Sequence, residues 1–187
     1  MNQNNQQTDS TTFLSILKYG DPILRKKVLQ IDDFTIIPEM VEQMFHTMAK
    51  EHGVGLAANQ VGWRFNLMVI DTHNCEGEEG GEACIFINSE ILTEEGEVIM
   101  EEGCLSVPDI RANIKRAEAI TLKYQDINQN FHERYFSGFI SRVIQHEMDH
   151  LNGKLFIDYL PLTKRMLINK RLLEISKKGK PSSAIIL

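Results

Sequence analysis

Residues 145–150 read Gln-His-Glu-Met-Asp-His and lie within a run of apolar residues at helical spacing. That apolar stripe consists of Phe139, Ile140, Val143, Ile144, Met148 and Leu151. Side chains four residues apart lie one helical turn above each other, so His146 and His150 can reach one metal ion. Glu147 is rotated about 100° from His146, where its carboxylate could act as a base on a water at the metal without being a ligand. The stretch predicts a buried helix that carries part of a metal-dependent hydrolase site.

This predicted helix has recognisable ends. Ser137 is a candidate N-cap, and Asn152 with Gly153 forms a good C-terminal stop. Two histidines four residues apart also occur as ordinary hydrogen-bonded core residues. Burying Glu147 between them without a function would cost free energy, however, and this favours the functional interpretation.

A catalytic metal site of this kind uses three protein ligands and leaves the fourth position to water. The candidate third ligand is Cys104, which lies in the stretch Glu-Glu-Gly-Cys-Leu-Ser-Val-Pro at residues 101–108. Gly103 permits an unusual backbone conformation there, and Pro108 is expected to end regular strand pairing soon afterwards. Taken alone, Cys104 is equally well explained as a small buried apolar residue.

Residues 53–62 form a third segment, Gly-Val-Gly-Leu-Ala-Ala-Asn-Gln-Val-Gly, whose small residues allow the main chain to approach a ligand closely. The order GxGLAAxQ, EGCLS, HExDH resembles the peptide deformylase family in all three of its defining motifs. These motifs span residues 53–150, and no motif position departs from the pattern. The resemblance implies a hydrolase that removes the formyl group from the N-terminal formyl-methionine of newly made polypeptides and releases formate.

The resemblance also implies roles for individual residues. The metal would be held by Cys104, His146 and His150, with Glu147 as the base. The side-chain amide of Gln60 and the backbone N–H of Leu105 would stabilise the tetrahedral oxyanion. The candidate substrate contacts are the backbone of Val54 and Gly55 and a methionine pocket lined by Met100, Phe139 and Val143.

The identity of the divalent ion depends on which argument is used. Two imidazoles and one thiolate suit zinc by ligand type. The resemblance instead implies Fe²⁺ in the cell, with Zn²⁺, Ni²⁺ or Co²⁺ able to occupy the same site.

Two other classes of protein share parts of this pattern. A zincin-type endopeptidase uses a similar helix but usually takes its third ligand downstream of it, whereas Cys104 lies upstream. A non-catalytic protein that binds metal for stability would want a fourth protein ligand, and no obvious one is present. Formate release from a formyl-methionyl peptide, without internal cleavage, would separate these possibilities.

Composition predicts one domain. A chain of 187 residues with 42% hydrophobic content can bury one substantial core. We expect a polar, disordered N-terminus at residues 1–10, a catalytic domain at 11–180 and a short tail at 181–187. No apolar stretch approaches the ~20 residues of a membrane helix, so no membrane partner is expected. Three cysteines without CxxC spacing argue against a disulfide framework and predict a reducing, cytoplasmic location.

The predicted fold class is α+β. A helix should begin near Pro38 and end before Gly53, and strand-like segments occur at 66–72, 84–92, 119–125 and 131–136. Short polar turns between strands favour antiparallel pairing. We therefore expect a mostly antiparallel sheet around a central metal-binding helix, with N-terminal and C-terminal helices packed outside.

The C-terminal segment carries an unusual concentration of positive charge. Residues 161–187 contain seven basic residues and one acidic residue, a net charge of +6 in a chain whose total is −6. They predict a basic helix over about 161–178, with an apolar face formed by Leu162, Met166, Ile168, Leu172, Leu173 and Ile175. Such asymmetry favours an anionic partner, although a merely solvated helix would look the same. The resemblance implies docking on the ribosome, without recognition of a specific nucleic-acid sequence.

Overall fold

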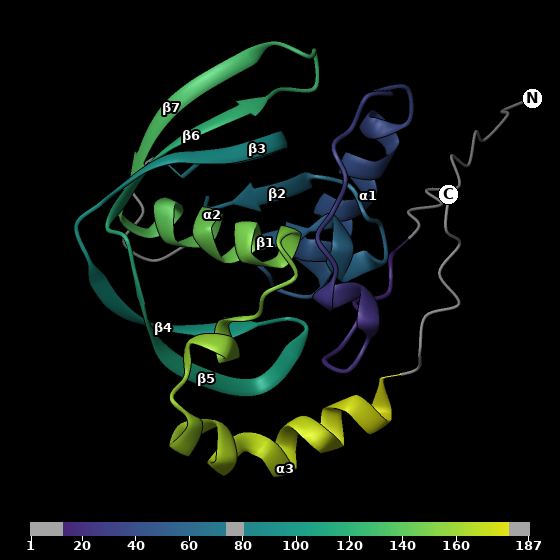
Figure 1. Ribbon diagram of the computed structural model, residues 1–187. Helices are drawn as coiled ribbons and strands as arrows, with labels where there is room; N and C mark the ends of the chain where they lie inside the picture. Colours follow the sequence, from purple (N-terminus) through teal and green to yellow (C-terminus); the bar gives the residue numbers. More distant parts are fainter. Residues whose placement is uncertain (1–12, 74–80, 180–187) are drawn as a thin grey trace, which may run out of the picture.

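Two antiparallel sheets enclose a central helix, α2 (Gly138–Leu151), in the computed structural model, which describes residues 13–73 and 81–179 (Figure 1). The larger sheet has the order β1-β2-β3-β6-β7 and the smaller sheet pairs β4 with β5. Their bounds are β1 Gly55–Ala57, β2 Leu67–Asp71, β3 Ala83–Glu95, β4 Val98–Cys104, β5 Val107–Arg116, β6 Ala119–Gln125 and β7 Phe131–Ser137. In Figure 1, α2 lies between the two sheets. The predicted α+β class, with antiparallel strands around the metal-binding helix, is confirmed.

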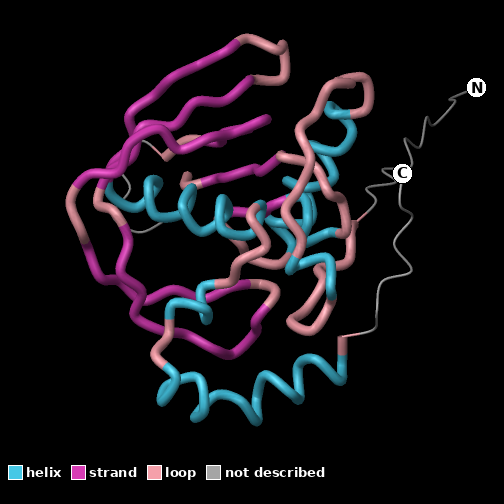
Figure 2. Tube along the Cα trace, in the orientation of Figure 1, coloured by secondary structure: helices cyan, strands magenta, loops and turns pink. Residues whose placement is uncertain are grey.

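Two further helices lie outside this arrangement. The N-terminal helix α1 (Ile37–Lys50) contacts β1 and β2, while the C-terminal helix α3 (Leu162–Lys178) runs along the outside of the β4–β5 sheet (Figures 1 and 2). Short 3₁₀ segments at Pro22–Arg25, Ala58–Val61 and Phe156–Tyr159 connect the larger elements. No helix in the two described ranges is long and apolar enough to span a membrane. The predicted termini at 1–10 and 181–187 lie outside the described residues.

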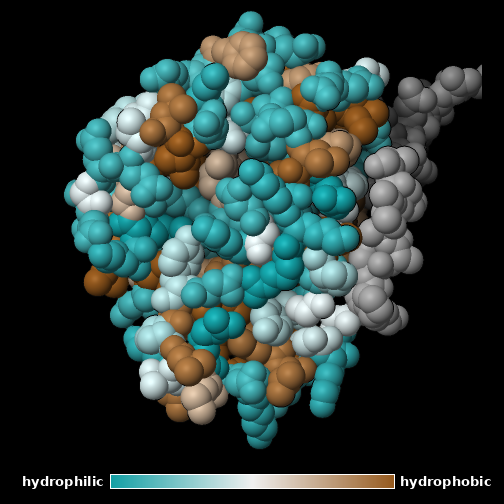
Figure 3. Space-filling model, viewed as in Figure 1, coloured by the Kyte–Doolittle hydropathy of each residue, from teal (hydrophilic) through white to brown (hydrophobic). Residues whose placement is uncertain are grey.

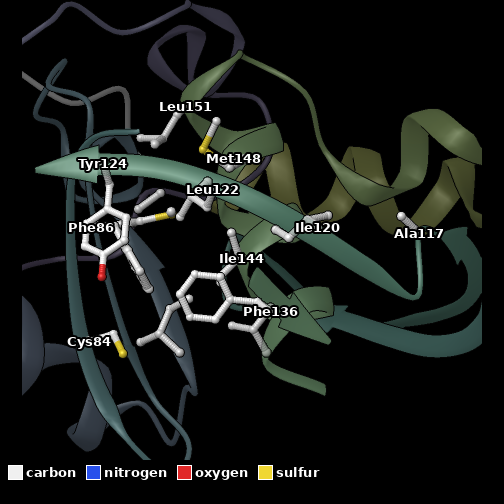
Figure 4. Packing of buried hydrophobic residues seen from close by; sticks show 14 residues of the cluster. Cys84, Phe86, Ala117, Ile120, Leu122, Tyr124, Phe136, Ile144, Met148 and Leu151 are labelled. Carbon is white, nitrogen blue, oxygen red and sulfur yellow. The ribbon is translucent and has the colours of Figure 1, made fainter. Parts of the chain in front are cut away.

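The core between the larger sheet and α2 fixes the orientation of that helix. Phe86 packs edge to face against Tyr124 and Phe136, with ring centroids 4.8 and 5.7 Å apart. Ile144 and Met148 of α2 belong to the same buried cluster (Figure 4). Burial of these side chains stabilises the helix by roughly 1.5–3 kcal/mol each. As a result, the remaining side of α2 is directed at the β4–β5 sheet.

The β4–β5 sheet was not predicted from the sequence. Most side chains of β4 are exposed, so the strand lacks the alternating apolar pattern by which strands are recognised. Gly103 does not use the conformational freedom of glycine, because it pairs with Arg111 and its φ is outside the left-handed region. The expectation that Pro108 ends regular pairing is wrong, because Pro108 lies within β5 at the register shift and pairing resumes at Arg111. The register changes one residue after Gly103, where Cys104 pairs with Val107. This irregularity ends β4 at the cysteine.

Candidate active site

The three predicted metal ligands come together between β4 and α2. Cys104 is the last residue of β4, while His146 and His150 are one turn apart on α2. One ligand atom from each residue lies within 4.8 Å of the other two, and Cys104 Sγ is 3.1 Å from His150 Nε2. Ligands bound at about 2.0–2.3 Å around one tetrahedral ion have separations of this size. The cluster could therefore bind a metal ion.

The two imidazoles also stabilise Cys104 as a thiolate. Burial raises the pKa of the Cys104 thiol, but the positive charge of His150 and hydrogen bonds from both imidazoles outweigh it and lower the pKa well below 9.0. Ser106 N–H also donates to Cys104 Sγ at 3.4 Å. Conversely, hydrogen bonds to Cys104 and Glu102 overcome burial and raise the pKa of His146 to about 10. The site thus stabilises a thiolate, which is the form of cysteine that ligates metals.

Glu102 orients His146. Its Oε2 lies 3.0 Å from His146 Nδ1, which leaves Nε2 of that ring for the cluster. Arg116 donates two hydrogen bonds to Glu102, at 2.6 and 2.9 Å, and Arg142 donates one at 2.6 Å. Burial would raise the pKa of Glu102, but hydrogen bonds from His146 and Arg116 lower it to about 2. Glu102 is therefore an ionised acceptor for the ligand imidazole.

The sequence did not reveal the role of Arg142. Its side chain is 4% exposed and also donates to the carbonyls of Ile114 and Val98, so it ties α2 to both strands of the smaller sheet. A charged residue among the apolar residues of a buried helix was the available signal.

Arg116 makes a second ion pair, with Asp149 Oδ2 at 2.8 Å, and Tyr159 donates to Asp149 Oδ1. Both carboxylate oxygens of Asp149 are therefore occupied by partners outside the cluster of Cys104, His146 and His150. Arg111 of β5 does not join this network, and its Nη1 lies 3.8 Å from Glu101 Oε2 instead.

Glu147 is buried beside the ligands without a hydrogen-bond partner for Oε2 among the residues the structure describes. Burial raises the pKa of its carboxyl group, and the positive charges of His146 and His150 oppose that shift. A Cβ placed on Gly55 would lie 2.6 Å from Glu147 Oε1, so only glycine leaves room for this carboxylate. His150 Nδ1 is likewise buried and unpartnered within the described chain. Unsatisfied buried polar atoms indicate a site that expects a ligand or water.

Gln60 and Leu105, the predicted oxyanion donors, border the same site. Ala57 N–H donates to Gln60 Oε1 at 2.8 Å, which directs the amide NH₂ toward Ser106 Oγ at 3.2 Å and Cys104 Sγ at 3.7 Å. Leu105 directly follows Cys104, and its carbonyl accepts a hydrogen bond from Lys18 Nζ at 2.9 Å. The Gln60 amide is thus fixed with its donors facing the thiolate.

A cavity of about 660 Å³ opens onto these groups. Its lining includes Cys104, His146, Glu147, Gln60 and Leu105, and also the predicted substrate contacts Val54, Gly55, Phe139 and Val143. Met100 is absent from the lining and is 39% exposed on β4, outside the predicted methionine pocket. A second cavity, about 1170 Å³, is larger but contains none of the three ligands. The smaller cavity is therefore the one that is lined by the proposed catalytic groups.

Comparisons with known proteins agree with the motifs. A family model described as polypeptide deformylase matches residues 13–166. A peptide deformylase of Zymomonas mobilis is 46% identical over 171 residues, which is 88% of this chain and 95% of the relative. Peptide deformylase 2 of Xanthomonas campestris is 43% identical over 168 residues, which is 88% of this chain and 96% of the relative.

Solved structures give the same result. The peptide deformylase of Thermus thermophilus superposes with a TM-score of 0.83 at 35% identity and covers 89% of this chain and 99% of its own. The Legionella pneumophila enzyme has a TM-score of 0.81 at 36% identity, covering 89% and 96%. With a matching family model, relatives of nearly equal length and the same fold, this chain belongs to the peptide deformylase family.

Proposed function

We propose that this protein is a metal-dependent hydrolase that removes the formyl group from the N-terminal formyl-methionine of newly made polypeptides and releases formate. The observation that carries the proposal is the buried, unpartnered carboxylate of Glu147 beside a Cys/His/His cluster in a cavity. Membership of the peptide deformylase family supports the same reaction.

Cys104, His146 and His150 would hold one divalent ion, which we propose to be Fe²⁺ in the cell and replaceable by Zn²⁺, Ni²⁺ or Co²⁺. Such an ion, when bound, acidifies water and polarises a carbonyl oxygen. A thiolate with two neutral imidazoles leaves it one net positive charge, which suits both effects.

Glu147 is the proposed general base and acid. It takes a proton from the water that attacks the formyl carbon and later delivers a proton to the leaving amine. Its raised pKa supports the first step, because a carboxylate whose pKa is raised is a stronger base than an ordinary glutamate.

Gln60 Nε2 and the Leu105 backbone N–H would stabilise the oxyanion of the tetrahedral intermediate. The fixed orientation of the Gln60 amide supports this role, because its donors need no reorganisation during the reaction. Val54 and Gly55 would contact the peptide backbone, and Phe139 and Val143 would line the methionine pocket. Met100 has no part in this proposal, because it does not line the cavity.

The deciding experiment measures formate released from a short formyl-methionyl peptide, together with the peptide products. We expect one formate and one free N-terminal methionine per peptide, without cleavage of internal bonds. Internal cleavage would indicate an endopeptidase instead. Bound metal with neither product would indicate a structural metal site.

We further propose that α3 docks the enzyme on ribosomal RNA phosphates. Five of its basic residues are exposed: Lys164, Arg165, Lys170, Lys177 and Lys178. The predicted apolar face is only partly correct, because Leu172 and Ile175 are buried whereas Leu162, Met166 and Leu173 are exposed. In Figure 3, hydrophobic and hydrophilic residues mix at the bottom of the molecule, where Figure 1 places α3. Exposed basic and apolar side chains together suit a partner surface better than a merely solvated helix.

A further inference from the structure

An N-terminal segment outside the three motifs contacts both proposed oxyanion donors. Leu17 N–H donates to the carbonyl of Gln60 at 2.7 Å, and Tyr19 N–H donates to the carbonyl of Ser106 at 2.8 Å. Between them, Lys18 Nζ donates to the carbonyl of Leu105 at 2.9 Å. Three consecutive residues therefore connect the loop that carries Gln60 to the loop that carries Leu105.

Lys18 makes the side-chain contact of the three. The Leu105 carbonyl and the Ser106 N–H belong to one planar peptide unit, so holding the carbonyl also holds the N–H. That N–H donates to Cys104 Sγ at 3.4 Å. The Leu105 N–H belongs to the preceding peptide unit, which joins the first at the Leu105 Cα. An ammonium bonded to the carbonyl thus anchors one of the two peptide units that meet at the Leu105 Cα, which limits how far the Leu105 N–H can turn.

The Lys18 side chain is held in a partly buried position that a free lysine would avoid. Burial lowers the pKa of its ammonium, while the negative charges of Glu51 and Cys104 act in the opposite direction. The ammonium is thus partly withdrawn from water while it bonds to the Leu105 carbonyl.

The segment also packs against α3. Gly20 has φ +105°, and a Cβ on it would lie 2.2 Å from Ser176 Oγ of α3. Close packing against α3 on one side and three hydrogen bonds on the other leave the backbone of residues 17–20 little freedom to move. The backbone that carries Lys18 is consequently held in place.

We infer that Lys18 is a positioning residue for deformylation, which aims the Leu105 N–H at the oxyanion by holding the Leu105 carbonyl. This inference rests on the proposed function, because it assumes that Leu105 and Gln60 are the oxyanion donors. Lys18 does not contact the reacting atoms and acts only through the loop.

The test replaces Lys18 with methionine, which keeps the unbranched shape and most of the length of the side chain but removes its donors and charge. Removing an oxyanion donor costs about 10²–10³ in kcat, and displacing one costs less. For Lys18→Met we expect kcat on a short formyl-methionyl peptide to fall on the order of 10- to 100-fold with KM within about twofold of wild type. Metal content and thermal midpoint should stay unchanged. Lys18→Arg should recover most of the lost kcat, because a guanidinium can also donate to the carbonyl.

Lys50→Met is the matched control. The Lys50 ammonium lies 4.1 Å from the Phe13 ring, so this variant also removes a lysine contact with the N-terminal segment but leaves Leu105 untouched. We expect wild-type kinetics for it. If Lys18→Met fails to fold, Lys18→Gln is measured instead. We expect the same loss of kcat, because the glutamine side chain is shorter than that of lysine and does not reach the Leu105 carbonyl.

A folded Lys18 variant with kcat within twofold of wild type would overturn the inference, as would an equal loss in Lys50→Met or failure of Lys18→Arg to recover activity. These outcomes leave the proposed function intact, since the wild-type enzyme is active in each. If the wild-type protein releases no formate, the proposed function fails and this inference fails with it.

Discussion

Two buried glutamates at the metal cluster have opposite environments. Glu102 receives hydrogen bonds from His146, Arg116 and Arg142, and its pKa is lowered to about 2. Glu147 Oε2 has no hydrogen-bond donor within residues 13–73 and 81–179, and burial raises the pKa of this carboxyl group. One carboxylate therefore stays ionised and orients the His146 imidazole, while the other holds a proton more readily than an ordinary glutamate. Separation of two pKa values by environment is a common way to assign such roles.

Glu147→Gln tests the proposed base. The amide has nearly the same shape but cannot accept a proton, so we expect kcat to fall by ~10²–10⁴-fold or more while metal content stays at the wild-type level. Cys104→Ala is the contrasting variant, since it leaves two imidazoles and should lose metal as well as activity. Activity assays paired with metal analysis distinguish the two. Near-normal turnover of metal-loaded Glu147→Gln would remove Glu147 from this role.

Gly55→Ala tests the space reserved for the same carboxylate. The new Cβ would lie 2.6 Å from Glu147 Oε1 and 2.8 Å from Val143 Cγ1, so one of these side chains must shift. Misplacement of a reacting group by a fraction of an ångström is expected to reduce kcat/KM by about 10-fold or more.

Gly103→Ala is its control, because the Cβ there would make ordinary contact with Arg111 at 3.6 Å. We expect that variant to keep activity within a few-fold of wild type. Equal activities of the two alanine variants would show that the space beside Glu147 is not critical.

At the scale of elements, a network of buried charges joins α2 to the β4–β5 sheet. Glu102 is on β4, Arg116 ends β5, and Arg142 is in α2, all with side chains about 4–5% exposed. Breaking one partner of such a buried group typically costs 3–5 kcal/mol, because the other charges lose their compensation. The network thus fixes Cys104 on the sheet against the histidines on the helix.

Glu102→Gln should destabilise the fold in a pH-dependent manner. The folded-state pKa of about 2 is below the usual 4.5, so the ionised carboxylate stabilises the protein above pH 4.5, and this contribution is lost as pH falls toward 2. A shift of this size corresponds to about 3 kcal/mol.

Denaturant unfolding of wild type and Glu102→Gln, both treated with a chelator, should therefore differ most near pH 7. The difference should shrink between about pH 5 and 2. A difference that is constant with pH would mean that packing, and not charge, explains the loss.

On the scale of the whole molecule, the charge of α3 is opposite to that of the remaining chain. Residues 161–187 carry +6, which leaves −12 for the rest. Removing α3 would expose the core, since Leu172 and Ile175 pack with Val107 and Ile110. Neutralising its exposed charges tests docking without this damage.

We expect Lys164, Arg165, Lys170, Lys177 and Lys178, replaced together by glutamine, to abolish salt-sensitive co-sedimentation with ribosomes. Hydrolysis of a short formyl-methionyl peptide should be unchanged, because none of these residues lines the active-site cavity. The control replaces Lys26, Lys27 and Lys154, which are also exposed but lie outside α3. If the α3 variant still sediments like wild type, the helix is not the docking surface.

The sequence by itself determined the central helix and the chemistry it carries. His146, Glu147 and His150 are related by helical spacing, which is a local property and therefore readable without a fold. The strands β2, β3, β6 and β7 were also predicted within a few residues. The side chains of β2 and β6 are mostly buried in the core, whereas β7 is mostly exposed and was recognised from its residue types. Cys104 could be predicted as a candidate ligand from its motif. Its distance from the two histidines could not be predicted from the sequence.

Only the tertiary structure decided which distant residues support that helix. The pairing of β4 with β5 brings Glu102 and Arg116 to α2, and the three hydrogen bonds of residues 17–19 reach loops more than 40 residues away. It also turned Met100 away from the cavity and left part of the predicted apolar face of α3 in solvent. Such contacts depend on how whole elements pack against one another, and local periodicity carries no information about packing partners.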